Sequence, residues 1–210
     1  TYLTAAGCSF GASTSSGIGT FRMSTGGRLV LLRDVPELFT GAASGRVDLG
    51  TGGGVIDTAG FRTTVSRGLA NQSGQTGSLT KTGAGTMQLN GISTYNGTTT
   101  VSGGTLIVGA GAKIYSGAYH GSAVLAVNSG STVDLQNWGY AEPAGTTMSL
   151  GGLRNNANAI VISGGTIRVS GGTATSYDRG VTVNATGATF EAATGANWTM
   201  AAGAITNVYT

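Results

Sequence analysis

One motif recurs four times between residues 102 and 192 and constrains the fold more than any other feature. Each copy reads Ser or Thr, Gly, a small residue, Thr and then alternating apolar positions, starting at residues 102, 129, 163 and 186. A short apolar segment precedes each copy, reading TTTV, VLAV, IVI and VTV. Alternation with period two predicts strands with one buried face. Glycine between them supplies the backbone angles of a tight corner.

Two short strands, a glycine corner and a longer return loop describe one rung of a parallel β-helix. The unequal intervals between copies favour a coil whose loops differ in length over a strictly periodic helix. We therefore predict an all-β fold, a single parallel β-helix over residues 1–210, excised from a larger protein. A β-sandwich of many short strands is the alternative fold.

The first part of the chain fits the same pattern less regularly. The segments GGRLVLL, GRVDLG, GGVIDT and FRTTV are interpreted as degenerate rungs. The segment RDVPELF, residues 33–39, instead predicts a helical turn, because Asp34 can cap it and Pro36 lies near its start. The glycine-rich GTGGG at 50–54 lacks the Lys of a phosphate-binding loop and is interpreted as a corner.

Composition distinguishes this chain from a disordered glycine-rich polymer. It has 39 glycines and 2 prolines, but 40% of its residues are hydrophobic and only 9% are charged. Disordered chains show the opposite balance. The 11 basic residues exceed the 8 acidic ones by only three and form no run. We therefore predict no nucleic-acid partner, and no apolar run is long enough to predict a membrane span.

The sequence gives little support to catalysis. A glycosidase needs two carboxyl groups on either side of the scissile bond, and a metal needs a cluster of ligands. The acidic residues are Asp34, Glu37, Asp48, Asp57, Asp134, Glu142, Asp178 and Glu191. No local cluster is visible, and the single histidine, His120, lies beside aromatic residues rather than a nucleophile motif. We predict no enzyme, metal or cofactor; a hydrolase or lyase using Glu142 with Asp178 is the third-ranked hypothesis.

Asp134 and Glu191 occupy the same place in two copies of the motif, on the outward side of the predicted strand. They could face each other across two rungs. We interpret them instead as part of a polar outer surface, because the outward face of a half-buried strand is ordinarily polar.

The return loops carry the most suggestive side chains. After each copy of the motif comes a longer loop with aromatic residues, and loops at the same place in successive rungs should stack on one flank at about 4.8 Å per rung. Aromatic planes pack against sugar rings, while amide and charged side chains bind hydroxyl groups. The predicted carbohydrate-binding residues are Tyr115, Tyr119, His120, Gln136, Asn137, Trp138, Tyr140, Tyr177, Asp178, Arg179 and Trp198.

One stretch resembles a known family. In residues 55–108 the pattern is similar to the autotransporter-associated β-strand repeat of large bacterial surface proteins. The residues that carry the resemblance are Leu79, Lys81, Gly83, Gly85, Thr86, Leu89, Thr94, Tyr95, Gly97, Thr98, Gly103, Gly104, Thr105 and Leu106. The resemblance implies a right-handed β-helix in a protein that is secreted or displayed on a bacterial surface. Because the repeat itself uses Tyr95, we interpret this ring as part of the architecture.

Two functions follow from these patterns. The first is a non-catalytic carbohydrate-binding module for a linear plant cell-wall polysaccharide, xylan above others, attached to a glycoside hydrolase domain. In general type the chain is similar to the right-handed β-helix modules of gut-bacterial xylanases. The alternative is a structural or adhesive β-helix segment of an autotransporter-like surface protein, with no soluble glycan ligand.

Overall fold

The computed structural model describes residues 20–39, 45–114, 125–137, 159–171 and 180–196 with their side chains, and residues 3–11 and 205–207 as backbone. The strands in these ranges form two sheets. The larger sheet contains, in spatial order, β17 (Ile205–Asn207), β15 (Val181–Val183), β13 (Ile160–Ser163), β11 (Leu125–Asn128), β9 (Thr99–Val101), β7 (Leu79–Thr82), β4 (Gly54–Asp57), β2 (Thr20–Leu31), β3 (Arg46–Leu49) and β6 (Leu69–Asn71), with β1 (Leu3–Gly11) paired to β2. The smaller sheet contains β16 (Thr189–Ala192), β14 (Thr166–Val169), β12 (Ser131–Leu135), β10 (Gly104–Val108), β8 (Thr86–Leu89) and β5 (Arg62–Val65).

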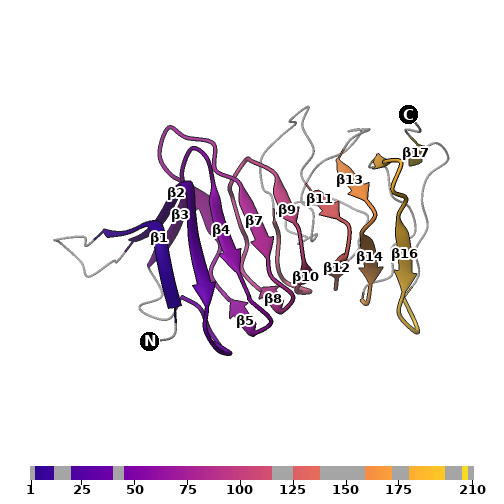
Figure 1. Ribbon diagram of the computed structural model, residues 1–210, viewed down its shortest axis with the longest axis horizontal. Coiled ribbons are helices and arrows are strands. Elements are labelled where there is room, and N and C mark those ends of the chain that lie inside the picture. The colour runs from indigo at the N-terminus through magenta and orange to yellow at the C-terminus, as the bar shows by residue number, and fades with distance from the viewer. Residues whose placement is uncertain are drawn as a thin grey trace.

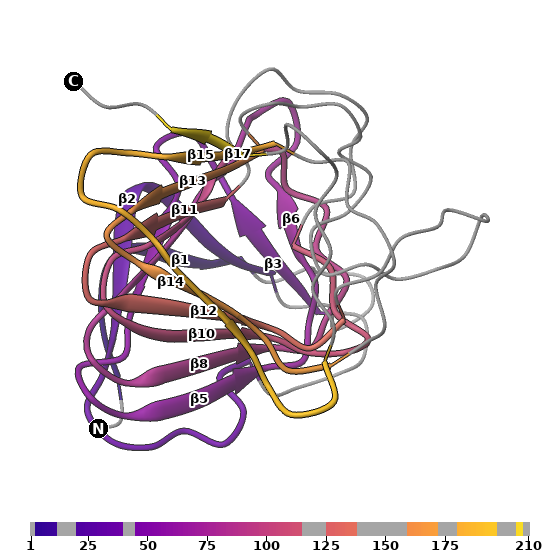
Figure 2. The ribbon, with the colours of Figure 1, turned by 90° about the vertical axis from the view of Figure 1, so that its right-hand side faces the viewer.

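The chain winds as a coil, and from β7 onward each turn adds one strand to each sheet (Figure 1). Consecutive strands such as β7 and β8 lie in different sheets, and each pairs in parallel with the strands of the neighbouring turns. Viewed along the coil, the strands of each sheet stack one behind another (Figure 2). The predicted all-β parallel β-helix is confirmed, and the alternative β-sandwich is not the fold.

The first turns have a third side. The long strand β2 serves two sides, because Phe21 pairs with Val47 of β3 whereas Leu29 pairs with Ile56 of β4. Between the two halves the backbone turns through the left-handed region at Thr25, with φ of 53°. Strand β6 then stacks on β3. The segments predicted as degenerate rungs are therefore strands of the coil, and GTGGG is the corner between β3 and β4, as predicted.

The prediction of a helical turn at 33–39 is wrong. Val35 forms an isolated parallel bridge with Thr63, and the N–H groups of Val35 and Leu38 donate to carbonyl oxygens of β5 at 2.9 and 2.8 Å. Asp34 accepts the N–H of Arg62 at 2.7 Å instead of capping a helix of its own. The edge of β5 offers backbone partners that outweigh the local capping preference. Pro36 is compatible with this edge position, because proline has no backbone N–H and the donors to β5 are Val35 and Leu38.

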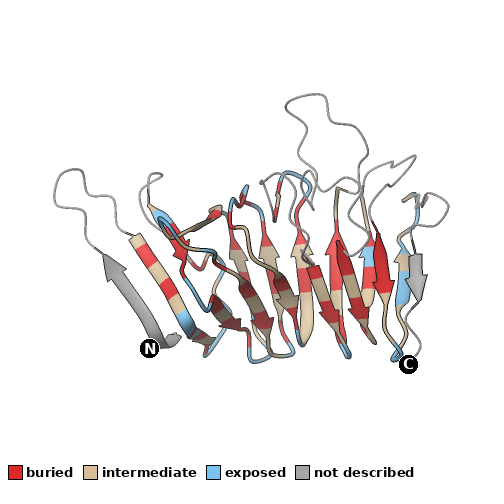
Figure 3. Cartoon of the chain, turned by 90° about the horizontal axis from the view of Figure 1, so that it is seen from above, coloured by how far each residue is buried: buried red, intermediate tan, exposed pale blue. Residues whose placement is uncertain are grey.

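The core is a stack of inward side chains in register. On the smaller sheet the fully buried residues Met87, Leu106, Val133 and Ile167 share one register position. On the larger sheet one inward column runs Leu29, Ile56, Lys81, Val101, Val127 and Ile162. Buried and partly exposed residues alternate along the strands in Figure 3. Each fully buried aliphatic side chain stabilises the fold by about 2 kcal/mol, and the lysine in this column requires a separate explanation.

The corners stack at backbone contact, which yields a test at Gly85. A Cβ atom on Gly85 would lie 1.9 Å from the carbonyl oxygen of Phe61 in the preceding rung. That oxygen already accepts the N–H of Thr86 at 2.9 Å, so it cannot move away freely. We expect Gly85→Ala to lower the free energy of unfolding by about 3 kcal/mol, measured by urea denaturation.

The matched control is Gly111→Ala, because nothing lies within 4 Å of its Cβ position. This variant should stay within about 0.5 kcal/mol of the wild type. Equal effects of the two substitutions would contradict the close packing of the corners.

Candidate functional site

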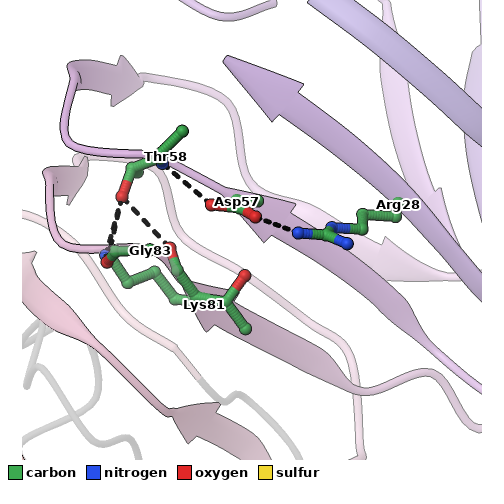
Figure 4. A network of polar contacts seen from close by, with 7 residues as sticks. Arg28, Asp57, Thr58, Lys81 and Gly83 are labelled. Atoms are coloured by element: carbon green, nitrogen blue, oxygen red, sulfur yellow. Dashed lines mark hydrogen bonds and ion pairs between the residues drawn. The ribbon is translucent and has the colours of Figure 1, made fainter. Parts of the chain in front are cut away.

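Lys81 projects from β7 into the interior of the coil, where it is fully buried. Its Nζ lies 2.9 Å from Thr58 Oγ1, 2.6 Å from the carbonyl oxygen of Gly83, 2.8 Å from that of Gly103 and 3.1 Å from that of Thr82. An ammonium group has three protons, so it shares them among these four acceptors. Figure 4 shows Lys81 beside Thr58 and Gly83. The acceptors come from the corners that follow β4, β7 and β9, three successive rungs.

An ion pair extends this network to an earlier strand. The buried Asp57 of β4 pairs with Arg28 of β2 (Figure 4). Asp57 also accepts the N–H of Ala59 at 2.8 Å. Burial acts to raise the pKa of the Asp57 carboxyl group, but its bonds to Arg28 and Ala59 and the positive charges of Arg28 and Lys81 lower that pKa overall. We call Arg28, Asp57, Thr58 and Lys81, with the corner carbonyl groups that Lys81 contacts, the corner network.

Burial lowers the pKa of Lys81 to about 8, because leaving water penalises the charged form; the negative charge of Asp57 offsets part of this effect. The alkyl stem of Lys81 takes the inward place that Ile56 and Val101 fill in the neighbouring rungs. Its ammonium group then reaches the corner, where it contacts the carbonyl oxygens of Thr82, Gly83 and Gly103. The stem of Lys81 is thus part of the apolar column, while its ammonium group donates hydrogen bonds to the corner carbonyl groups.

Sequence reasoning treated Lys81 only as part of the repeat signature and did not place it inside the coil. The signal was nevertheless present: in LTKTGAG, Lys81 lies two residues after Leu79 and therefore on the same face of the strand. Both residues are fully buried.

Tyr95 is fully buried, which confirms its predicted architectural role. Its hydroxyl group shares a hydrogen bond with the hydroxyl group of Thr99, which occupies an inward position of β9. Burial raises the pKa of the Tyr95 phenol. Thr99 therefore has a partner inside the coil, as a buried polar group requires.

The outer face of the smaller sheet carries the acidic residues that occupy equivalent places in the motif. Arg168 lies between Asp134 and Glu191 in one outward column, and its Nε is 2.9 Å from Glu191 Oε2. Ser170 donates a hydrogen bond to Asp134. The two carboxylates are thus separated by a cation and do not form the facing pair that glycoside hydrolysis needs. Among the described residues, no three or more His, Cys, Asp or Glu side chains gather as a metal site.

Of the predicted carbohydrate-binding residues, Gln136 and Asn137 fall within the described ranges. The N–H of Gln136 donates to the carbonyl oxygen of Val108 at 3.0 Å, and the side chain of Asn137 donates to that of Ala110 at 3.0 Å. Both residues continue the ladder where the chain leaves β12. The other predicted residues lie outside the described part of the chain: Tyr115, Tyr119, His120, Trp138, Tyr140, Tyr177, Asp178, Arg179 and Trp198.

The chain leaves the smaller sheet at the same level in successive rungs. The first residue after a strand of this sheet donates its N–H to the last residue of the neighbouring strand, one rung earlier. This holds for Gly109, Gln136, Ser170 and Ala193, with N–H to carbonyl oxygen distances of 2.8 to 3.2 Å. The starts of the return loops are therefore stacked on one flank, as the sequence predicted.

Comparison with known families bears on the rungs that hold the corner network. Residues 79–108 match the passenger-associated-transport-repeat. The match begins at the first residue of β7, ends at the last residue of β10 and includes both Lys81 and Tyr95. It supports the resemblance to autotransporter-associated repeats and says nothing about xylan-binding modules. No curated protein and no solved structure matches the chain. The described residues include no helix long and apolar enough to cross a membrane.

The corner network predicts a large effect of Lys81→Met. The substitution keeps the apolar stem but leaves the corner carbonyl groups without their buried donor. We expect the free energy of unfolding at pH 7 to fall by about 3 kcal/mol in urea denaturation. Lys113→Met, at the chain's other lysine, is the matched control and should change it by less than about 0.5 kcal/mol.

Wild type and Lys81→Met also test the lowered pKa of Lys81. Between about pH 8 and the ordinary lysine pKa of 10.5, unfolded chains carry a proton on Lys81 that folded chains have lost. Stability rises with pH wherever the unfolded state binds more protons. The stability gap between wild type and Lys81→Met should therefore widen from pH 8 to pH 10. A gap that stays constant with pH would show that the Lys81 pKa is unshifted.

Proposed function

We propose that this chain is a structural β-helix segment of a bacterial protein that is secreted or displayed on the cell surface, of the autotransporter type. The observation that carries the proposal is the repeat match over residues 79–108, which spans one complete turn of the coil and both strands of the next turn. The same strand register continues on both sides of the matched rungs, from β2 to β17. In this role the chain is not an enzyme and uses no cofactor.

The physical properties of the coil suit a spacer. Each rung adds about 4.8 Å of length, and its stiffness comes from continuous backbone pairing in both sheets. The inward side chains of each rung pack on those of the next, so the coil can lengthen rung by rung without a wider core. The outer face of the smaller sheet carries polar side chains such as Gln88, Arg168 and Glu191, which need no ligand to be satisfied in water.

Surface display can be tested on intact cells of the source bacterium. Antibodies raised against the purified chain should label unpermeabilised cells or bind antigen in the culture medium, and external protease should remove the label. A cytoplasmic enzyme measured in parallel serves as the control for lysis. Antigen found only after the cells are broken would contradict the proposal.

Binding of a plant cell-wall polysaccharide, xylan above others, is a second proposal, and one observation favours it. The starts of the return loops stack on one flank at one-rung spacing, the arrangement a linear glycan would need. The aromatic rings of these loops would pack on successive sugars, and a linked glycoside hydrolase domain would be the covalent partner.

Affinity electrophoresis separates the two proposals. A glycan-binding chain should be retarded in gels containing xylan, and Trp138→Ala should lose this retardation while its circular dichroism stays unchanged. Mixed-linkage glucan and cellulose are the specificity controls. If none of these polysaccharides retards the wild-type chain, the second proposal fails and the structural role stands alone.

A further inference from the structure

We propose that Lys81 is the mechanical clamp of the coil: it joins the rungs from β2 to β10 into one block that opens as a unit under tension. The inference deepens the proposed structural role and rests on it, because a spacer between a cell surface and its surroundings is pulled from both ends.

Most contacts in a solenoid join only neighbouring rungs. In this coil the aliphatic columns do so, with Ile162 stacked on Val127 and Val127 stacked on Val101. A column of this kind can separate one rung at a time, because losing the outermost side chain leaves the next interface intact. Tension applied at the ends should therefore peel such rungs singly.

The corner network differs because one atom holds several rungs. Lys81 Nζ bonds to Thr58 on one side, Gly83 in its own corner and Gly103 on the other side, at 2.6 to 2.9 Å. The pair between Asp57 and Arg28 extends the chain of polar contacts to β2. These contacts link four successive rungs through two buried charged side chains, Asp57 and Lys81.

The corners further along the described chain carry a weaker arrangement. Asn128 donates to Ser102 at 2.8 Å, and Asn184 donates to Ser163 at 2.8 Å. Each of these neutral pairs joins two adjacent rungs only. On the outer face, Arg168 and Glu191 form an ion pair between adjacent rungs, but their side chains are 49% and 42% exposed. The described coil thus has a buried, multiply linked charged block followed by rungs linked in pairs.

Separating a rung from the block has a cost beyond its own contacts. Moving the corner of β9 away takes one acceptor from a buried ammonium group and admits water beside it. A buried charge that loses a partner is strongly destabilising, so the remaining contacts of Lys81 become weaker in turn. The rungs around Lys81 should therefore give way together rather than in sequence.

Single-molecule pulling on the whole chain, held by its two ends, tests this. We expect rungs beyond β10 to release in short steps, followed at higher force by one long step. Residues 20–108 extended at roughly 3.4 Å each give a length gain of about 300 Å for this final step. A wild-type chain that releases residues 20–108 in rung-sized steps of about 70 Å would overturn the proposal.

Two variants distinguish a linking role of Lys81 from a general contribution to stability. Lys81→Met should replace the long step by several rung-sized ones. Val101→Ala removes buried volume from the same column one rung away; it should lower the force but keep the single long step. A single long step in both variants, or its loss in both, would show that Lys81 has no special linking role.

Amide hydrogen exchange of the wild type gives a second reading should Lys81→Met not fold. Amides of β4, β7 and β9 should share one opening rate under denaturant, at least tenfold slower than those of β13 and β15. Graded rates across β4, β7 and β9 would count against the block. Both experiments use the purified chain, so their failure leaves the surface-display result unaffected.

Discussion

A strand in a parallel sheet cannot pair with the strand that immediately precedes it without a long crossover, and the rest of this structure depends on how that constraint is met. Here the crossover is the remainder of the turn: the chain leaves the larger sheet, turns a corner, adds a strand to the smaller sheet and returns. Every corner must stack closely on the one before, which is why Gly85 lies against the Phe61 carbonyl group. Stacked corners also bring several carbonyl oxygens together, and these are the groups that the ammonium of Lys81 satisfies.

Much of the coil could be predicted from the sequence, because alternation and corner glycines are local signals. The four motif copies became β10, β12, β14 and β16, and the segments before them became β9, β11, β13 and β15. Residues 33–39 were predicted wrongly, because their backbone partners come from Arg62 and Thr64, distant in sequence. The corner network could not be predicted for the same reason. Strand alternation places Lys81 on the inward face, but the oxygen atoms that it contacts belong to three different turns. For the carbohydrate site, only Gln136 and Asn137 fall within the described residues, so that part stays a prediction.

The two proposals place function on different parts of the same coil. A structural role uses the strand pairing of both sheets, the inward columns and the corner network. Of that network, Lys81, Gly83 and Gly103 lie within the residues that match the passenger-associated-transport-repeat. Glycan binding would use the return loops, which leave the ladder on one flank at one-rung intervals. The two demands do not conflict physically, because loop side chains contribute little to stacking. The repeat match covers the paired strands β7 to β10, so it supports the structural role more directly than glycan binding.

The register of β7 and β9 has a consequence for how such a chain can change over time. Leu79 and Thr99 occupy the same inward position on successive turns, so the segment from one to the other is a complete turn of the coil. Copying or deleting that segment in the gene would join ends that already fit, since residue 99 would stack where residue 79 stood. Molecular length in this architecture is therefore inherited in whole turns, and recombination can alter it without disturbing the turns at either end.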